Sequence, residues 1–221
     1  QGKFTLKQDP NRPMRAVVNQ GTIRTSPGGS VVLIAPVVNN EGAIVSPGGR
    51  VALAAGNNAV VTMDDDGLVN VGINGAVPGA VIVSKDQASS LLQMAVNTSG
   101  VVHAGGARVV GDEIVLEGAE GLAMNQGRID VDAAVAGATA GQVTIASSQI
   151  SVLTHGSQIT ARGELAGARG GRVDVLSHNR VGMFGSARID ASGHVGGGRV
   201  RFGGPAEGAH ARMEMYNADG S

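Results

Sequence analysis

The sequence predicts an all-β chain that winds as a parallel β-helix, a solenoid in which successive coils stack on one another. The first observation is a repeated Asn-x-Gly-x-Ile pattern. It occurs at Asn19, Gly21 and Ile23, at Asn40, Gly42 and Ile44, and at Asn125, Gly127 and Ile129. The second is a Ser-Pro-Gly-Gly-x-Val segment that begins at Ser26 and again at Ser46. Repetition at about twenty residues is typical of solenoids, in which each repeat is stable only against its neighbours.

Composition supports a thin, stacked core. Glycine accounts for 36 of 221 residues, against a usual share of ~7%. Hydrophobic residues make up 42%, which is enough to build a core from Val, Ile, Leu and Ala. Aromatic residues make up only 2%, far fewer than a globular enzyme of this size normally carries.

Charge and residue usage exclude several classes of partner. The formal net charge is -1, so bulk electrostatics attract neither nucleic acid nor an anionic membrane. The absence of cysteine excludes disulfides and thiolate metal sites. No apolar run approaches the ~20 residues of a membrane span. Because the chain begins at Gln1, we expect that a leader was removed or that a longer protein contains this segment.

The first elements follow in order. Residues 1–15 are predicted to form a lead-in arm, and the first coil begins at Val17. Short alternating strands are expected at 31–34, 44–45 and 51–55, each closed by Asn, Gly or Pro-Gly. At these corners, Asn and Gly are expected to supply the positive φ angles that sharp turns need.

Residues 60–83 depart from the repeat and predict a small meander outside the coils. Alternating runs at 60–63 and 68–71 flank an acidic Asp-Gly turn, and Asn-Gly follows at 74–75. Both dipeptides are strong hairpin signals. Residues 85–96 could form one helical segment with Ser84 as its cap.

The repeat is expected to resume at residues 100–109, and then the period lengthens to thirty residues. Ile129, Ile159 and Ile189 show this spacing. The added Gly- and Ala-rich length falls at one corner, in residues 133–140 and 162–169. We therefore expect loops that line up on one edge of a rod of roughly eight coils. Residues 205–221 form a tail in which 213–216 could be a last strand.

In-register stacking predicts ladders of equivalent side chains. Three apolar columns and one polar ladder are expected: Ile129, Ile159 and Ile189; Val143, Val173 and Val200; Ile145, Val175 and Phe202; Arg128, Gln158 and Arg188. The same spacing brings Asp132 near Arg162, and Asp174 near Arg201.

The repeat motifs resemble the secretion-domain region of filamentous haemagglutinin-type exoproteins of two-partner secretion systems. An acidic turn, Asp-Asp-Asp-Gly-Leu at 64–68, and coils at 187–198 extend the resemblance over most of residues 16–204. The family's Asn-Pro-Asn-Gly and Asn-Pro-Asn-Leu motifs do not occur. The segments that carry the resemblance are Val-Val-Asn-Gln-Gly-Thr-Ile at 17–23, Pro-Gly-Gly at 27–29, Val-Val-Leu-Ile-Ala-Pro at 31–36, Val-Asn-Asn-Glu-Gly at 38–42 and Pro-Gly-Gly-Arg-Val-Ala-Leu-Ala-Ala-Gly at 47–56.

This resemblance implies a right-handed β-helix and a non-enzymatic part of a secreted or surface adhesin, or less often a cytolysin. It implies export through the periplasm of a Gram-negative bacterium and a dedicated outer-membrane transporter as partner. Residues 16–110 would serve secretion and residues 111–204 the stalk. A host-cell receptor or a glycan is the expected ligand, and bare coil ends would allow end-to-end self-association. No cofactor is implied.

Three candidate sites follow. Asp64, Asp65 and Asp66 could hold Ca²⁺, although their spacing is not that of a calcium loop and a solvated turn explains them better. Asp130 and Asp190 could act as a carboxylate pair of a polysaccharide-active enzyme, but Thr160 between them predicts a separation near ~9.6 Å. A glycan- or receptor-binding strip on the corner loops is the third candidate. Its possible contact residues are Asp132, Arg162, Glu164 and Arg169.

Overall fold

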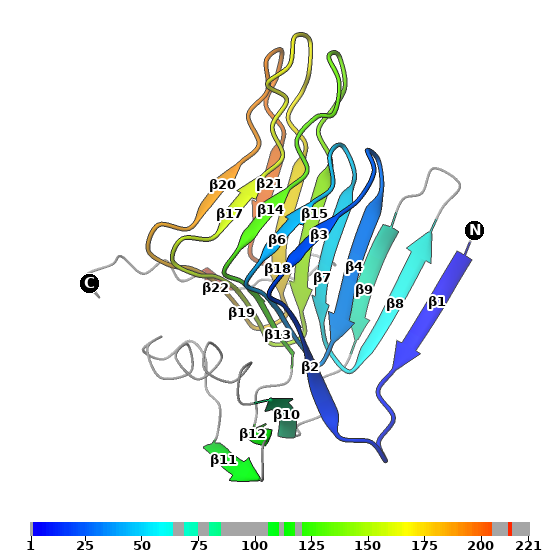
Figure 1. Ribbon diagram of the computed structural model, residues 1–221, viewed down its shortest axis with the longest axis vertical. Coiled ribbons are helices and arrows are strands. Elements are labelled where there is room, and N and C mark those ends of the chain that lie inside the picture. Colours follow the sequence, from blue (N-terminus) through cyan, green and yellow to red (C-terminus); the bar gives the residue numbers. More distant parts are fainter. Residues whose placement is uncertain are drawn as a thin grey trace.

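The chain folds into sheets of mostly parallel strands (Figure 1). Within the part that the computed structural model describes, all regular secondary structure is β-strand. The described residues are 2–63, 69–74, 80–84, 106–110, 113–117, 121–204 and 212–213.

Five times along the described residues, three consecutive strands contribute one strand each to three different parallel sheets. We call each such set a strand triplet. The triplets are β2 (Met14–Asn19), β3 (Thr22–Arg24) and β4 (Ser30–Ala35); β5 (Val37–Asn40), β6 (Ala43–Val45) and β7 (Arg50–Ala55); β13 (Leu122–Asn125), β14 (Arg128–Asp130) and β15 (Gln142–Ser147); β16 (Ile150–Leu153), β17 (Gln158–Thr160) and β18 (Arg172–Ser177); β19 (Arg180–Met183), β20 (Arg188–Asp190) and β21 (Arg199–Phe202).

Each triplet lies in register on the next. Ile129 pairs with Ile44 on one side and with Ile159 on the other, and Ile159 pairs with Ile189. The predicted isoleucine column is therefore confirmed. The other predicted ladders are confirmed as well: Val143, Val173 and Val200; Ile145, Val175 and Phe202; Arg128, Gln158 and Arg188.

The core is built from side chains of all three parallel sheets. Ile44, Ile129 and Ile159 are each 0% exposed and belong to one hydrophobic cluster with Val38. Full burial of a side chain of this size contributes ~1.5–3 kcal/mol. Val200, in the last triplet, is 49% exposed. Val200 pairs with a neighbouring triplet on one side only, at Val173.

The second and third triplets are neighbours in space, although residues 56–121 separate them in the sequence. Leu122 of β13 pairs directly with Val37 of β5. The prediction that the repeat resumes at 100–109 is wrong for residues 106–109, because β11 (Gly106–Val110) pairs antiparallel with β12 (Glu113–Glu117), and residues 100–105 lie outside the described residues. An alternating apolar run suits either kind of pairing, so the local pattern could not decide between them. The described residues form five triplets, not the eight coils expected.

A three-stranded antiparallel sheet stands beside the parallel stack (Figure 1). β8 (Asn58–Met63) pairs with β9 (Val69–Asn74), which confirms the predicted hairpin, and also with β1 (Gly2–Lys7) of the lead-in arm. β9 contacts β7 and β15, and the outward-facing Ala52 and Ala54 of β7 are buried. The antiparallel sheet therefore covers part of the stack.

Four further strands extend the sheet of first strands, three at one edge and one at the other. β10 (Ala80–Ser84) does not join the predicted meander, because it pairs in parallel with β2 and antiparallel with β12. At the other end, β22 (Arg212–Met213) pairs in parallel with β19 and overlaps the predicted last strand at Met213 only. The helix expected at 85–96 lies outside the described residues.

The asparagines of the repeat form a buried ladder. The Asn19 Nδ2 atom donates to Asn40 Oδ1 at 2.7 Å, and Asn40 Nδ2 donates to Asn125 Oδ1 at 2.8 Å. Asn40 and Asn125 are 0% exposed. The expectation of positive φ at asparagine is wrong, because no described residue other than glycine has it. The ladder ends where Leu153 pairs with Asn125.

The glycines of the same motif are explained by close stacking. A Cβ atom on Gly42 would overlap the carbonyl oxygen of Gly21, and one on Gly127 would overlap that of Gly42. None of these three glycines has a positive φ. Gly42 and Gly127 therefore let one backbone approach the next. The positive φ expected at corner glycines occurs instead at Gly28 and Gly48.

Candidate functional site

Three long loops project from one corner of the stack and lie side by side (Figure 1). They connect the second and third strands of the last three triplets, and we call residues 131–141, 161–171 and 191–198 the corner loops. In the first two triplets the same corner is short, at residues 25–29 and 46–49. The prediction that successive corners bulge on one edge is confirmed.

Backbone hydrogen bonds hold the corner loops in register beyond the strands. The Ala133 N–H donates to the Arg162 carbonyl at 2.8 Å, and the Gly137 N–H donates to the Ala166 carbonyl at 2.9 Å. Gly163 bonds in the same way to Ser192 at 2.8 Å. The loops therefore form a fixed surface that continues the stacking of the sheets.

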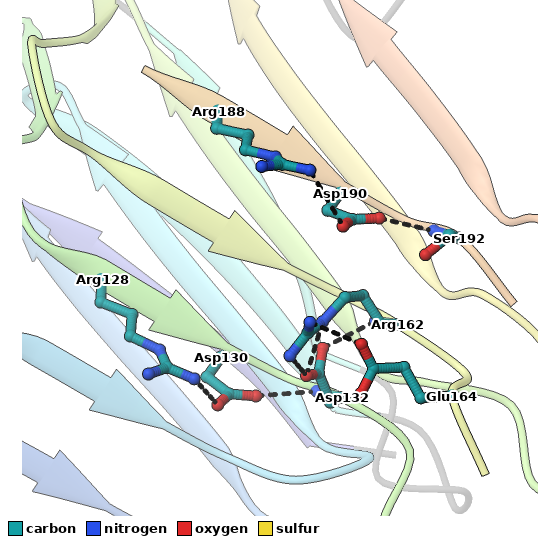
Figure 2. A network of polar contacts seen from close by, with 8 residues as sticks. All are labelled: Arg128, Asp130, Asp132, Arg162, Glu164, Arg188, Asp190 and Ser192. Atoms are coloured by element: carbon teal, nitrogen blue, oxygen red, sulfur yellow. Dashed lines mark hydrogen bonds and ion pairs between the residues drawn. The ribbon is translucent and has the colours of Figure 1, made fainter. Parts of the chain in front are cut away.

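Arg162 ties the second corner loop to the first (Figure 2). Its Nε and Nη2 atoms donate to Asp132 Oδ2 at 3.0 and 2.7 Å, and its backbone N–H donates to Asp132 Oδ1 at 2.7 Å. Its Nη1 atom also lies 2.6 Å from Glu164. Hydrogen bonding to Asp132 is the main cause that raises the pKa of the Arg162 guanidinium. The predicted contact between Asp132 and Arg162 is confirmed, and it fixes loop geometry.

Arg169 and Glu164 have different surroundings. The Arg169 backbone bridges the three loops by pairing with Thr139 on one side and with Gly196 on the other. The Glu164 side chain is 64% exposed and forms an ion pair with Arg162. Of the four predicted loop contacts, Asp132, Arg162 and Glu164 form one cluster, whereas Arg169 acts through its backbone.

Asp130 and Asp190 stand on one ladder with Thr160 between them, as the spacing predicted. Arg128 Nη2 donates to Asp130 Oδ2 at 2.6 Å, and the other Asp130 oxygen accepts from the Asp132 N–H at 3.1 Å (Figure 2). Asp190 Oδ1 accepts from the Ser192 N–H at 3.0 Å. Each carboxylate is thus held by residues of its own triplet.

Ser192 should set the ionisation of Asp190. The Ser192 hydroxyl and N–H, followed by Arg162 and Arg188, lower the pKa of Asp190 below its ordinary value of 3.8. A depressed folded-state pKa contributes stability that is present above pH 3.8 and is lost as the pH falls through the folded value. We expect Ser192→Ala to raise the Asp190 pKa and to cost less than about 1 kcal/mol at neutral pH, because the site is partly solvated.

An NMR titration of the Asp190 carboxyl in the wild type and in Ser192→Ala measures this shift. Urea unfolding at about pH 7 and about pH 2 tests the linked stability, and the difference between the two proteins should vanish at the lower pH. An Asp190 pKa that is unchanged by the substitution would contradict the assignment.

The outermost side chains of the corner loops are apolar and exposed. Val135, Leu165 and Val195 are 62%, 43% and 51% exposed. Val135 and Leu165 lie thirty residues apart in the first two corner loops, and Val195 lies in the shorter third loop. Single exposed apolar residues are common on protein surfaces, but these three lie on neighbouring corner loops, and we call them the apolar strip.

A second ladder was not singled out in the sequence. Arg50 pairs with Gln142, Gln142 with Arg172, and Arg172 with Arg199, and we call these four residues the basic ladder. A groove of about 620 Å³ runs along it, lined also by glycine corners and by Thr139 of the first corner loop. The signal was present in the sequence as Gly-Arg-Val at 49–51, 171–173 and 198–200, but we interpreted it only as a corner followed by a strand.

The structure was also searched for a metal site and for a membrane-spanning helix. Within the described residues, no group of three His, Cys, Asp or Glu side chains could hold a metal ion. The calcium candidate at 64–66 lies outside those residues. None of the described residues forms a helix that could cross a membrane.

Comparison with solved structures finds a similar chain in the crystal structure of the HMW1 secretion domain from Haemophilus influenzae. The two chains are 21% identical with a TM-score of 0.48, and the match covers 90% of this chain and 45% of that chain. This chain therefore spans less than half the length of that structure. No protein-family model and no curated protein matches the chain.

Proposed function

We propose that the chain is a right-handed parallel β-helix that forms a non-enzymatic segment of a large secreted adhesin. In this proposal, a dedicated outer-membrane transporter of the two-partner type exports the unfolded protein from the periplasm of a Gram-negative bacterium. The segment then folds at the cell surface and contributes to attachment.

The observation that carries the proposal is the completion of each triplet by its neighbours. Ile129 is fully buried, and its register partners Ile44 and Ile159 lie on either side of it. A stack of this kind can grow one triplet at a time, since each new triplet finds a template in the preceding one. Apolar burial makes each addition favourable, so the emerging chain is prevented from sliding back.

The two parts assigned from the sequence, 16–110 for secretion and 111–204 for the stalk, share one continuous stack. β13 of the second part pairs directly with β5 of the first. Folding that starts at the first two triplets can therefore extend into the stalk once residues 56–121 have emerged. End-to-end self-association would use the edge strands of the two five-stranded sheets. These are β3 and β4 at one end of the stack and β20 and β21 at the other.

Attachment is assigned to the corner loops. The observation that favours them is the strip of exposed Val135, Leu165 and Val195 on a hydrogen-bonded, stacked scaffold. A rigid scaffold lowers the entropic cost of binding, because the loops are ordered before the ligand arrives. A receptor or a glycan would bind along this edge.

A pair of deletions in the parent protein tests whether export depends on stacking. Deleting residues 131–160 joins Asp130 to Ala161 and preserves every ladder, because Asp130 and Thr160 are register partners. Deleting residues 131–155 joins Asp130 to Gly156 and breaks the ladders. We expect the first variant to be exported and the second to stay in the periplasm, as measured by immunoblotting of cell fractions, with binding to host cells scored in parallel.

Two results would reject the coupling of export to stacking. Equal export of both variants would mean that the ladders do not matter for secretion. Retention of both would mean that the sequence of residues 131–160 is itself required. Normal export with lost cell binding in the first variant would support attachment by the corner loops.

A further inference from the structure

We propose that the groove along the basic ladder binds an acidic polysaccharide, a linear polymer that carries carboxylate or sulfate groups at regular intervals. This proposal deepens the attachment part of the proposed function and does not depend on the route of export. It concerns a surface at the base of the corner loops, separate from the apolar strip at their tips.

The floor of the groove is bare backbone. The ladder residues each follow a glycine, and a Cβ atom on any of these glycines would overlap the carbonyl oxygen of the glycine in the neighbouring triplet. The glycines are Gly49, Gly141, Gly171 and Gly198. Close stacking therefore excludes larger residues here, and it leaves an open channel in which a polymer chain can approach the arginines.

The groove carries one sign of charge. Arg50, Arg172 and Arg199 line it, and no acidic residue does so among the described residues. Behind the groove, the Asp174 carboxylate is only 3% exposed and accepts from Arg172 Nε at 2.6 Å. Arg201 Nε lies 3.3 Å from the other Asp174 oxygen, although the two atoms are not aligned for a hydrogen bond. Two arginines around one carboxylate leave a net positive charge at this position.

Asp174 also fixes the orientation of Arg172. The hydrogen bond to Asp174 uses the Arg172 Nε atom, and the Arg172 side chain remains 44% exposed. A guanidinium group held in this way can present its terminal nitrogens to a carboxylate or sulfate as a planar, two-pronged donor. Holding the side chain in advance lowers the entropic cost of binding.

The spacing of the ladder favours a periodic ligand. Neighbouring rungs lie ~4.8 Å apart, so Arg172 and Arg199 are one step apart and Arg50 and Arg172 are two steps, or ~9.6 Å, apart. Gln142 separates Arg50 from Arg172 and offers both a donor and an acceptor to sugar hydroxyls. A polymer running along the stack can therefore meet cationic and neutral polar contacts in turn.

The composition of the groove disfavours other polymers. Its lining contains no aromatic residue, so neither a neutral sugar ring nor a nucleic-acid base has a stacking platform. The chain as a whole carries a net charge of -1, so it lacks the broad basic field of a nucleic-acid-binding protein. Local charge and hydrogen bonding remain as the basis for recognition.

Binding of purified 221-residue chain to alginate, heparin, neutral dextran and double-stranded DNA tests the proposal by isothermal titration calorimetry. The groove variant is Arg50→Gln with Arg199→Gln, which leaves Arg172 on Asp174. The matched control is Arg128→Gln with Arg188→Gln, two exposed arginines on the neighbouring sheet, with the same change in charge. Circular dichroism melting checks that both variants fold.

We expect the wild type to bind alginate or heparin and not dextran, with an affinity that falls between about 50 mM and about 200 mM salt. The groove variant should bind at least about tenfold more weakly, and the control should stay within about twofold. Absence of binding to both acidic polymers would overturn the proposal. So would equal losses in the two variants, or DNA binding at least as tight as polysaccharide binding. Failure here with intact export would leave the secretion role untouched.

Discussion

Replacing Gly42 with alanine should lower the free energy of unfolding by more than about 3 kcal/mol, whereas the same change at Gly21 should alter it by less than about 1 kcal/mol. Both glycines belong to the same repeat motif, and neither has a positive φ. They differ in the atoms that a Cβ atom at each position would meet. A new Cβ on Gly42 meets only backbone atoms of Gly21 and Gln20, and one on Gly21 meets nothing within 4 Å.

The large effect at Gly42 follows from the rigidity of the obstacle. The Gly21 carbonyl that a methyl group would overlap also accepts the Ala43 N–H at 2.9 Å. Moving the carbonyl away breaks this bond and separates the first two triplets. A flexible side chain could rotate out of the way at small cost, but a backbone held in a ladder cannot.

Urea unfolding followed by far-UV circular dichroism compares the two variants with the wild type. A loss at Gly21 as large as that at Gly42 would show that the glycine is needed for its backbone conformation and not for stacking. Because stacked repeats can unfold in parts, the midpoint of the cooperative transition is the quantity to compare.

The repeated spacing predicted the ladders but not the reasons for the residues in them. Ile129 and Ile159 had to be equivalent because their surrounding motifs are equivalent, and the register confirms it. The roles of Asn40 and Gly42 were misjudged because a turn and a close-packed ladder select the same residue types. In a single sequence, positive φ and close backbone approach both favour glycine.

The position of the third triplet shows a second limit of sequence reasoning. Residues 56–121 separate the second triplet from the third, and local alternation at 105–109 looked like the next coil before Leu122. The better signal was the full Asn-Gln-Gly-Arg-Ile motif at 125–129, which includes the glycine needed for close stacking. A local apolar pattern defines a strand, but only the corner residues identify its neighbour.

The basic ladder was missed for a related reason. Arg50, Arg172 and Arg199 each precede a valine of the inward column, so the valine column was predicted and the arginine column beside it was not. In a stacked fold, each position of the sequence repeat becomes a ladder of side chains that faces either the core or the surface. The inward ladders can be examined for packing, and the outward ladders should be examined in the same way for binding residues.

Substituting leucine for Asn40 alone should destabilise the chain by about 2–4 kcal/mol, because it leaves the amide of Asn19 and the buried oxygen of Asn125 without their partners. Asn40 is 0% exposed, so water cannot replace either bond at its position. The size of leucine is not the difficulty. The chain itself places Leu153 on Asn125 in the next triplet, where the ladder ends.

Replacing all three asparagines, Asn19, Asn40 and Asn125, with leucine should recover most of the stability lost by the single change. With every partner removed together, no buried polar atom of the ladder is left unsatisfied, and an apolar column takes its place. Chemical denaturation of the single and triple variants measures the difference. A triple variant that is less stable than Asn40→Leu would mean that the asparagines are required for the shape of the corner, beyond satisfying one another.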